Sequence, residues 1–261
     1  MDDNNDEILK SKEWLCRTRL LLGDESVARL QNASVLIVGL GGVGAYAAEM
    51  VCRAGVGHMT IVDGDVVDPT NLNRQLPALH STLGQPKAEV MAARLRDINP
   101  ALDLDARHLF IRDELTDHIL DAHHYDYVVD AIDSLSPKVN LALKCLERKI
   151  PLICSMGSGR KTDPSQIKIS DISKTSHCKL AKAMRKRLHR RGVEKGIQVV
   201  YSSEESDEDA VIGYVDDETG MTKSMGGTIC YLPAIFGCMC ASVVIRGILG
   251  LDKPRRQAAK G

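Results

Sequence analysis

The chain has 261 residues, of which 44% are hydrophobic and 26% are charged, and 34 Lys and Arg nearly balance 35 Asp and Glu to give a net charge of −1. This composition is globular and excludes a disordered or fibrous chain. A near-zero net charge gives no overall attraction to nucleic acid or membrane, so such binding must come from local patches. Aromatic residues make up only 3%, which argues against a module that stacks bases on rows of rings.

The two ends of the chain bear on cellular location. The first ten residues are acidic and polar, unlike an export signal, so we expect a cytoplasmic protein with free thiols. None of the eight cysteines forms a Cys-x-x-Cys pair, which predicts no zinc site. Residues 225–245 are uncharged and about long enough to span a membrane, but contain several Gly and a Pro. We expect a loop and a buried or subunit-interface helix there, without stable membrane insertion.

Strands and helices are predicted to alternate over the first 156 residues. The sequence predicts helices over 24–33, 45–54, 87–98, 112–123 and 137–148, and strands over 35–38, 59–62, 102–107, 127–130 and 152–154. Strands separated by helices of this length form βαβ units, so the predicted fold is α/β, with a Rossmann-like, doubly wound and mostly parallel sheet.

The pattern changes after residue 156. A strand over 166–172, a basic helix over 177–191 and a strand over 197–201 are predicted, followed by an acidic loop from Ser202 to Asp209. Such a run of charges is typical of a solvated, mobile loop. We therefore divide the chain into a nucleotide-binding part, residues 1–156, and an α+β extension, residues 157–261, within one continuous domain.

A glycine-rich loop follows the first strand and opens a helix. Its glycines, Gly39, Gly41, Gly42 and Gly44, allow a sharp turn and close approach of the backbone to phosphate, while the helix N-terminus supplies N–H groups. Asp63 ends the next strand, where a carboxylate accepts hydrogen bonds from ribose hydroxyls. This pattern predicts a nucleotide site but fits any nucleotide-binding Rossmann fold, including those of NAD enzymes.

Two cations and a group of amides follow this loop. Asn71, Asn73 and Arg74 lie in one segment, and Lys87 opens the helix behind Gly-Gln-Pro. Fixed cations beside amides suit a triphosphate whose charge must be neutralised. These residues favour a nucleoside triphosphate over a dinucleotide.

Two carboxylates stand where a predicted strand ends. Asp130 and Asp133 lie at the carboxyl end of a parallel strand, which is where open α/β sheets bind ligands. Mg²⁺ prefers one or two carboxylates together with phosphate oxygens. We predict that Asp130 contacts the nucleotide and that Asp133 holds Mg²⁺.

Taken together, these motifs resemble the adenylation site of the ubiquitin-activating, ThiF/MoeB-type superfamily. The resemblance implies a site for ATP and Mg²⁺ that transfers AMP to a carboxylate, with Arg74, Lys87 and Asp133 as catalytic residues. It also implies a homodimer, since Arg17 matches an N-terminal arginine that reaches the γ-phosphate in the opposite subunit. Arg19 lies close enough in the sequence to leave the choice between the two arginines open.

The segments 155–164 and 171–175 resemble the tRNA threonylcarbamoyladenosine dehydratase branch of that superfamily, whereas carrier-protein activators usually have two Cys-x-x-Cys pairs. The branch implies ATP-dependent activation of a threonyl carboxylate on tRNA, followed by loss of water and ring closure. Whether the activated species is an adenylate or a phosphate stays open, and so does a sulfur-transfer protein partner. Cys230 matches a cysteine of some relatives and is either a catalytic nucleophile or a small buried thiol.

A strongly basic segment supports the tRNA interpretation. Residues 174–195 contain nine Lys and Arg and one acid, Glu194. Leu180, Met184 and Leu188 form a stripe by which a helix can dock, leaving the other faces cationic. A solvated basic face is the alternative to tRNA-backbone binding. The candidate tRNA-binding residues are Lys182, Arg185, Lys186, Arg187, Arg190 and Arg191.

The sequence thus favours an ATP-dependent tRNA-modifying dehydratase. The first alternative is an adenylyltransferase that activates the C-terminal glycine of a ubiquitin-like sulfur-carrier protein. The second is a nucleotide-binding scaffold without chemistry, against which the presence of Arg74 and Asp133 argues.

Overall fold

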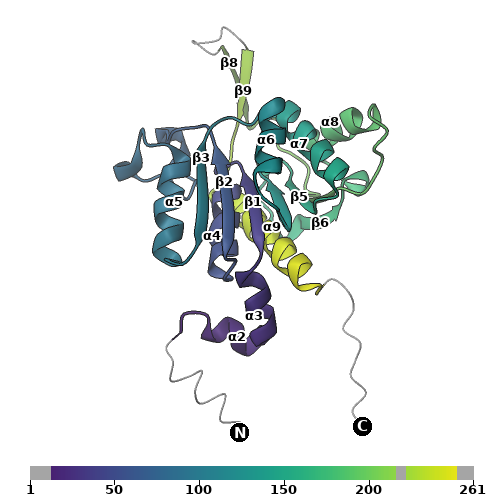
Figure 1. Cartoon of the computed structure of the whole chain (residues 1–261). Helices are drawn as coiled ribbons and strands as arrows, with labels where there is room; N and C mark the ends of the chain where they lie inside the picture. Colours follow the sequence, from purple (N-terminus) through teal and green to yellow (C-terminus); the bar gives the residue numbers. More distant parts are fainter. Residues whose placement is uncertain (1–12, 216–221, 252–261) are drawn as a thin grey trace.

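A seven-stranded sheet forms the centre of the protein in the computed structural model, which describes residues 13–215 and 222–251 (Figure 1). The strand order is β3-β2-β1-β4-β5-β7-β6, and every pair is parallel except β6 with β7. The central strands are short apolar runs that are buried on both faces, as parallel strands covered by helices must be. The strands are β1 Ser34–Val38, β2 His58–Asp63, β3 Asp103–His108, β4 Tyr127–Asp130, β5 Leu152–Ser155, β6 Ile167–Asp171 and β7 Gln198–Ser202.

Helices cover both faces of this sheet and make two apolar cores. On one face lie α4 (Gly44–Arg53), α5 (Lys87–Ile98) and α9 (Tyr231–Leu249), and α3 (Asp24–Gln31) packs against α9 below the strands in Figure 1. On the other lie α6 (Glu114–Ala122), α7 (Leu135–Arg148) and α8 (Lys179–His189). This three-layer arrangement confirms the predicted α/β class. Short 3-10 helices are η1 Pro69–Asn71, η2 His80–Thr82, η3 Pro164–Gln166 and η4 Ile172–Lys174.

The apolar C-terminal segment forms α9, as predicted, and packs on the sheet. It contacts α4, α3, β4, β5 and β7, and buries residues such as Leu232, Phe236 and Val244. Its length and hydropathy would also fit a membrane span, and half of its most apolar window is buried within the protein. In this structure α9 is a core helix.

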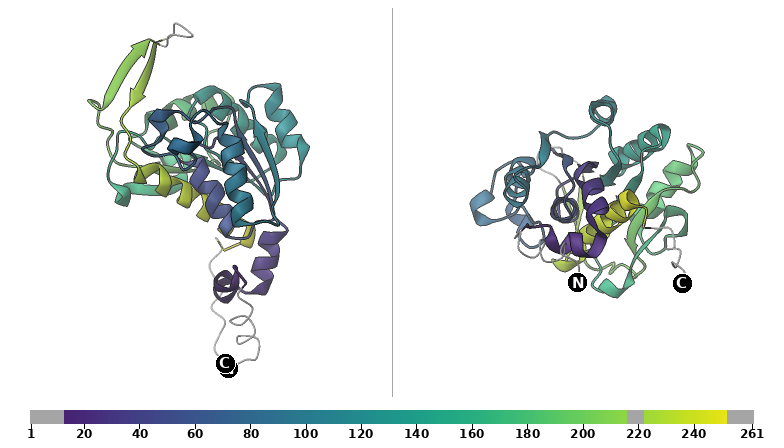
Figure 2. Two further views of the ribbon diagram at one scale, coloured as in Figure 1. Left: turned by 90° about the vertical axis from the view of Figure 1, so that its left-hand side faces the viewer. Right: turned by 60° about the horizontal axis from the view of Figure 1, so that its bottom comes forward.

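Apart from the short 3-10 helices, three of the described elements were not predicted. One is α2 (Cys16–Leu22), and the others are the strands β8 (Val211–Val215) and β9 (Thr222–Gly226), which pair as a hairpin that projects from the body (Figures 1 and 2). The sheet contains strands from both sides of the division at residue 156. The first ten residues, used above to argue against an export signal, lie outside the described part of the chain.

The order of the strands determines where a ligand can bind. The chain runs from β1 to β2 on one side, and β4 then pairs with the other side of β1. The connections leaving β1 and β4 therefore separate, and a crevice opens beyond the carboxyl ends of these strands. The glycine-rich loop follows β1, and Asp133 follows β4, so both lie at this crevice.

Candidate functional site

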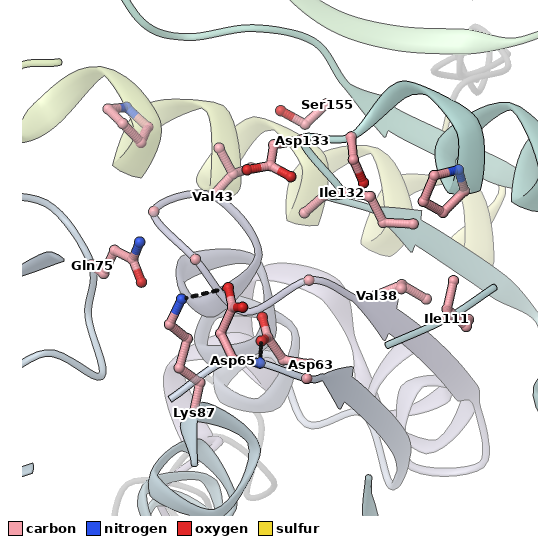
Figure 3. Close-up of a pocket in the computed structure, with 18 of the residues that line it drawn as sticks. Val38, Val43, Asp63, Asp65, Gln75, Lys87, Ile111, Ile132, Asp133 and Ser155 are labelled. Carbon is pink, nitrogen blue, oxygen red and sulfur yellow. Dashed lines mark hydrogen bonds and ion pairs between the residues drawn. The ribbon is translucent and has the colours of Figure 1, made fainter. Parts of the chain in front are cut away.

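A cavity of about 600 Å³ lies at the carboxyl edge of the sheet (Figure 3). Its walls come from the glycine-rich loop, the end of β2, the segment after β3, the turn after β4, the segment after β5 and the start of α9. Predicted site residues that line it are Gly39, Gly41, Gly42, Asp63, Arg74, Lys87 and Asp133. Residues far apart in sequence thus meet in one space.

Glycines are required where the loop leaves β1. Gly39 has φ +90°, and a Cβ there would lie 2.7 Å from the carbonyl oxygen of Ala131. A Cβ on Gly44 would lie 1.7 Å from the carbonyl oxygen of Gly39. Both contacts involve backbone atoms that cannot move aside cheaply. Gly44, the first residue of α4, is therefore needed for the conformation of the loop, although it does not itself line the cavity.

The Asp63 carboxylate ties β2 to the glycine-rich loop. Its Oδ2 accepts the backbone N–H of Leu40 at 2.6 Å, and its Oδ1 accepts that of Asp65 at 2.7 Å. Burial raises the pKa of Asp63 above its ordinary value, while these two N–H donors and the charge of Lys87 act in the opposite direction. Asp63 is at the position where the sequence predicts a ribose contact.

The two predicted cations have different surroundings. Lys87 is 4% exposed, and its Nζ lies 3.0 Å from Asp65 Oδ2 (Figure 3). Arg74 donates from Nη1 to Thr70 O and to Asn73 Oδ1, both at 2.9 Å. These contacts fix both cations at the wall of the cavity, so little side-chain freedom is lost when an anion binds.

Gln75 is a cavity residue that was not among the predicted site residues, although it belongs to the same Asn-Leu-Asn-Arg-Gln segment. Its Oε1 is buried and has no hydrogen-bond partner among the described residues. A buried acceptor without a donor is costly, so it favours a ligand or water that donates to it. Phe110 and Arg112 were also missed; both line the cavity, and the guanidinium lies 5.6 Å from the ring centroid. No sequence motif identified these two.

The structure gives the two carboxylates after β4 different positions. Asp133 is exposed and lines the cavity. Asp130 is fully buried beneath it, with its Oδ1 2.8 Å from Nζ of the equally buried Lys138 and 3.0 Å from the backbone N of Ile132. This placement corrects the predicted nucleotide contact of Asp130, because its carboxylate instead supports the turn that carries Asp133.

Asn71 and Asn73 support the loop that carries Arg74. Asn71 is buried, and its Oδ1 accepts the backbone N–H of Asp68 at 3.2 Å. Asn73 donates from Nδ2 to Thr228 O at 2.9 Å, which joins this loop to the segment before α9. Cys230 is exposed just before α9, between the cavity residues Thr228 and Pro233.

The basic helix docks on α7 by a slightly different stripe from the predicted one. Ala181, Met184 and Leu188 are buried, whereas Leu180 is half-buried and lines the cavity. Arg185 is also half-buried and donates from Nη1 to Thr175 Oγ1. This contact corrects its assignment to the exposed cationic face. The predicted cations that are exposed are Lys182, Lys186, Arg187, Arg190 and Arg191, and Arg187 donates to Ser136 Oγ at 2.6 Å.

The N-terminal arginines lie on α2, at the end of the molecule opposite the cavity (Figures 1 and 2). Arg19 is paired with Glu13 at 2.8 Å and with Asp24 at 2.5 Å, whereas Arg17 is exposed. Arg19 thus has ion-pair partners within this chain, whereas the side chain of Arg17 is open to solvent.

Comparison with known proteins places these features in a family. The ThiF family profile matches residues 15–260. The chain is 40% identical over 238 residues to the tRNA threonylcarbamoyladenosine dehydratase of Bacillus subtilis, covering 89% of this chain and 93% of that protein. It is 40% identical over 207 residues to the Escherichia coli dehydratase, covering 76% and 77% of the two chains.

A solved structure supports the same relationship. The crystal structure of the Escherichia coli tRNA N6-threonylcarbamoyladenosine dehydratase, TcdA, in complex with ATP has a TM-score of 0.80 and 33% sequence identity to this chain. The match covers 90% of this chain and 93% of the other. The similarity extends over nearly the whole chain and includes the region of the glycine-rich loop and of the cations at the cavity wall. The chain therefore belongs to the ThiF family.

Proposed function

We propose that this chain is an ATP-dependent tRNA threonylcarbamoyladenosine dehydratase, which activates the threonyl carboxylate of the modified adenosine and closes a ring with loss of water. One observation carries the proposal: a cavity with Arg74, Lys87 and Asp133 in its wall occurs in a chain 40% identical, over nearly its full length, to a protein of that name.

The cavity residues fit a nucleoside triphosphate. ATP, when bound, supplies a group that converts a carboxylate oxygen into a leaving group. Arg74 and Lys87 supply fixed positive charge, and Gln75 Oε1 is an acceptor without a donor. The backbone of Gly41 and Gly42 faces the same space. The substrate's own nitrogen or carbonyl oxygen then closes the ring within one molecule, which needs no protein nucleophile. A nucleophilic role for Cys230 stays a prediction.

Asp133 is our candidate for holding Mg²⁺. Among the described residues, no group of three or more His, Cys, Asp or Glu could hold a metal by itself. Mg²⁺ that is bound to a nucleotide needs only one or two protein carboxylates, since phosphate oxygens and water complete its shell. One exposed carboxylate in the cavity wall meets this requirement.

We further propose a homodimer in which Arg17 serves the partner's cavity. Trp14, Leu20 and Leu21 are large apolar residues that are 49%, 52% and 77% exposed at the end of the molecule that carries Arg17. Such an apolar group is typical of a protein interface. The helix α2 lies beyond the amino edge of the sheet (Figure 1), whereas the cavity lies at the carboxyl edge, which also favours action across subunits.

Mixing two inactive variants tests this arrangement. We expect Arg17→Ala and Asp133→Asn chains to regain activity when their subunits exchange, because one cavity of each mixed dimer then has both residues intact. The rate of ring closure before and after verified exchange measures this effect. Absence of recovery after exchange would show that Arg17 does not complete the partner's cavity.

The exposed cations of α8 are proposed to bind the tRNA backbone. Lys182, Lys186 and Arg190 are spaced by four residues and exposed, so they share one helix face. Replacing all three by Glu is expected to weaken tRNA binding and to make its salt dependence shallower by about two to three units in the log–log slope, for three lost phosphate contacts. ATP affinity, measured in parallel, should not change. Equal tRNA affinity and slope in variant and wild type would make this face only a solvated surface.

Cells offer a direct test of the function. We expect tRNA nucleosides from cells that lack this protein to retain the uncyclised threonylcarbamoyladenosine, and wild-type protein, but not the Asp133→Asn variant, to restore the dehydrated form. Mass spectrometry under conditions that preserve the ring distinguishes the two nucleosides. Normal cyclisation in the deletion strain, together with a defect in sulfur-carrier activation, would favour the carrier-protein alternative. A cytoplasmic location and a sulfur-transfer partner stay predictions.

A further inference from the structure

An ion cluster that the preceding function does not use lies at the edge of the cavity. Glu208, in the acidic loop 202–209, pairs with Arg160 Nη1 at 3.4 Å and with Lys179 Nζ. The two cations come from separate segments: Arg160 follows Gly159, and Lys179 precedes Leu180, and both Gly159 and Leu180 line the nucleotide cavity. One carboxylate therefore bridges two cations beside the cavity wall.

The backbone around this cluster is strained. Arg160 has φ +60° and His177 has φ +49°, and residues other than glycine rarely adopt this region of backbone conformation. Arg160 is held there by its own N–H, which donates to Gly227 O at 2.8 Å, and by its carbonyl, which accepts from Asp207 N at 3.0 Å. Strained residues persist where the surrounding structure fixes them, and they are common at binding sites. The fold thus positions the Arg160 side chain beside the acidic loop.

The acidic loop has a firm anchor that does not involve Glu208. The buried Lys161 ammonium donates to Ser202 O and Glu204 O, both at 2.7 Å, and to His177 O at 3.0 Å. The Glu204 carboxylate accepts the backbone N–H of Thr162 at 2.9 Å. These contacts hold the start of the loop in place whether or not Glu208 is paired.

The Glu208 contacts, by contrast, are exposed. The side chains of Glu208 and Lys179 are 60% and 65% exposed, whereas that of Arg160 is 17% exposed. Ion pairs as exposed as these contribute little free energy, so a competing anion can replace the carboxylate. Guanidinium and ammonium groups bind phosphate as they bind carboxylate.

We propose that Arg160 and Lys179 form a phosphodiester-binding site at the edge of the nucleotide cavity, and that Glu208 occupies this site in the free protein until RNA displaces it. This inference rests on the proposed function, because the phosphodiester is that of the tRNA segment next to the modified adenosine. Glu208 then acts as an internal competitor that weakens the binding of RNA lacking further contacts.

The site is tested by measuring the affinity for tRNA with ordinary phosphodiester linkages at several salt concentrations. Glu208→Gln removes the competing charge and should tighten tRNA binding by up to about fivefold, the upper end of what an exposed ion pair contributes. Asp209→Asn removes the same charge from the neighbouring, exposed position and should have a smaller effect. Lys179→Gln should weaken binding and reduce the salt slope by about 0.7, the value for one contact to a single strand.

Combining the variants shows whether the effect passes through the site. In the Lys179→Gln background, Glu208→Gln should give a smaller gain than in wild type, and ATP affinity should be equal in all four proteins. Equal gains from Glu208→Gln and Asp209→Asn would overturn the inference while leaving the proposed function intact. Wild-type protein that binds no tRNA at all would overturn the proposed function, and this inference with it.

Discussion

The Asp133→Asn variant is expected to lose about a hundredfold or more of its turnover while its ATP affinity stays within about tenfold of wild type. The carboxylate lies in the cavity wall and is proposed to hold Mg²⁺, whose position matters most as charge develops at phosphorus. Binding of the nucleotide in its ground state is expected to depend more on Arg74, Lys87 and the glycine-rich loop, which are our proposed nucleotide-binding residues. Turnover is measured as the rate of ring closure at saturating ATP, and ATP affinity is measured by calorimetry.

A matched control makes this result specific. Asp97→Asn carries the same chemical change on an exposed residue of α5, outside the cavity lining. It should retain wild-type turnover and ATP affinity. Full turnover in the Asp133→Asn protein would remove this carboxylate from the mechanism, and a loss of ATP binding that equals the loss of turnover would give it a role in nucleotide binding.

Replacement of Lys138 by Met is expected to lower the free energy of unfolding by about 3–5 kcal/mol. Both members of the Lys138–Asp130 pair are fully buried, so the variant leaves a carboxylate without its counter-charge in the protein interior. Asp130 Oδ2 already lacks a hydrogen-bond partner among the described residues, which leaves little to compensate the loss. Urea denaturation monitored by circular dichroism measures the change in the free energy of unfolding.

The double variant Asp130→Asn with Lys138→Met distinguishes the cost of an unpaired buried charge from other effects of replacing Lys138. Removing both charges should recover much of the lost stability, because no unpaired charge remains buried. Turnover should recover less than stability does, since the hydrogen bond from the backbone N–H of Ile132 to Asp130 loses its charge assistance in the turn that leads to Asp133. A double variant as unstable as Lys138→Met alone would contradict this account of the pair.

Much of the fold was readable because local patterns and tertiary structure agree. The apolar runs at 35–38 and 127–129 lack the alternation of apolar and polar residues that a surface strand shows, and both are buried in the sheet. The helix over 87–98 was predicted with the observed bounds, since Pro86 precedes it and Asn-Pro follows it. The glycine-rich loop lies where its strand–turn–helix context places it.

The parts that were missed depend on contacts between distant residues. The hairpin β8–β9 has Gly213, Lys223 and Ser224 inside its strands, so it lacks a clear alternation of apolar and polar residues. The burial of Asp130 could not be predicted, because its partner Lys138 looks like any helix lysine until α7 packs on β4. The sequence likewise places Arg185 on an exposed face, because it does not show that Thr175, directly after η4, accepts a hydrogen bond from this side chain.

Dehydration of the modified adenosine in tRNA can be observed in a single reaction with purified components. Purified protein is incubated with ATP, Mg²⁺ and tRNA that contains threonylcarbamoyladenosine, and the nucleosides are analysed by mass spectrometry under conditions that preserve the ring. We expect an ATP-dependent loss of the mass of one water from that nucleoside, absent with Asp133→Asn and retained with Asp97→Asn. An unchanged nucleoside, alongside ATP-dependent activation of a carrier protein's C-terminal glycine, would contradict it.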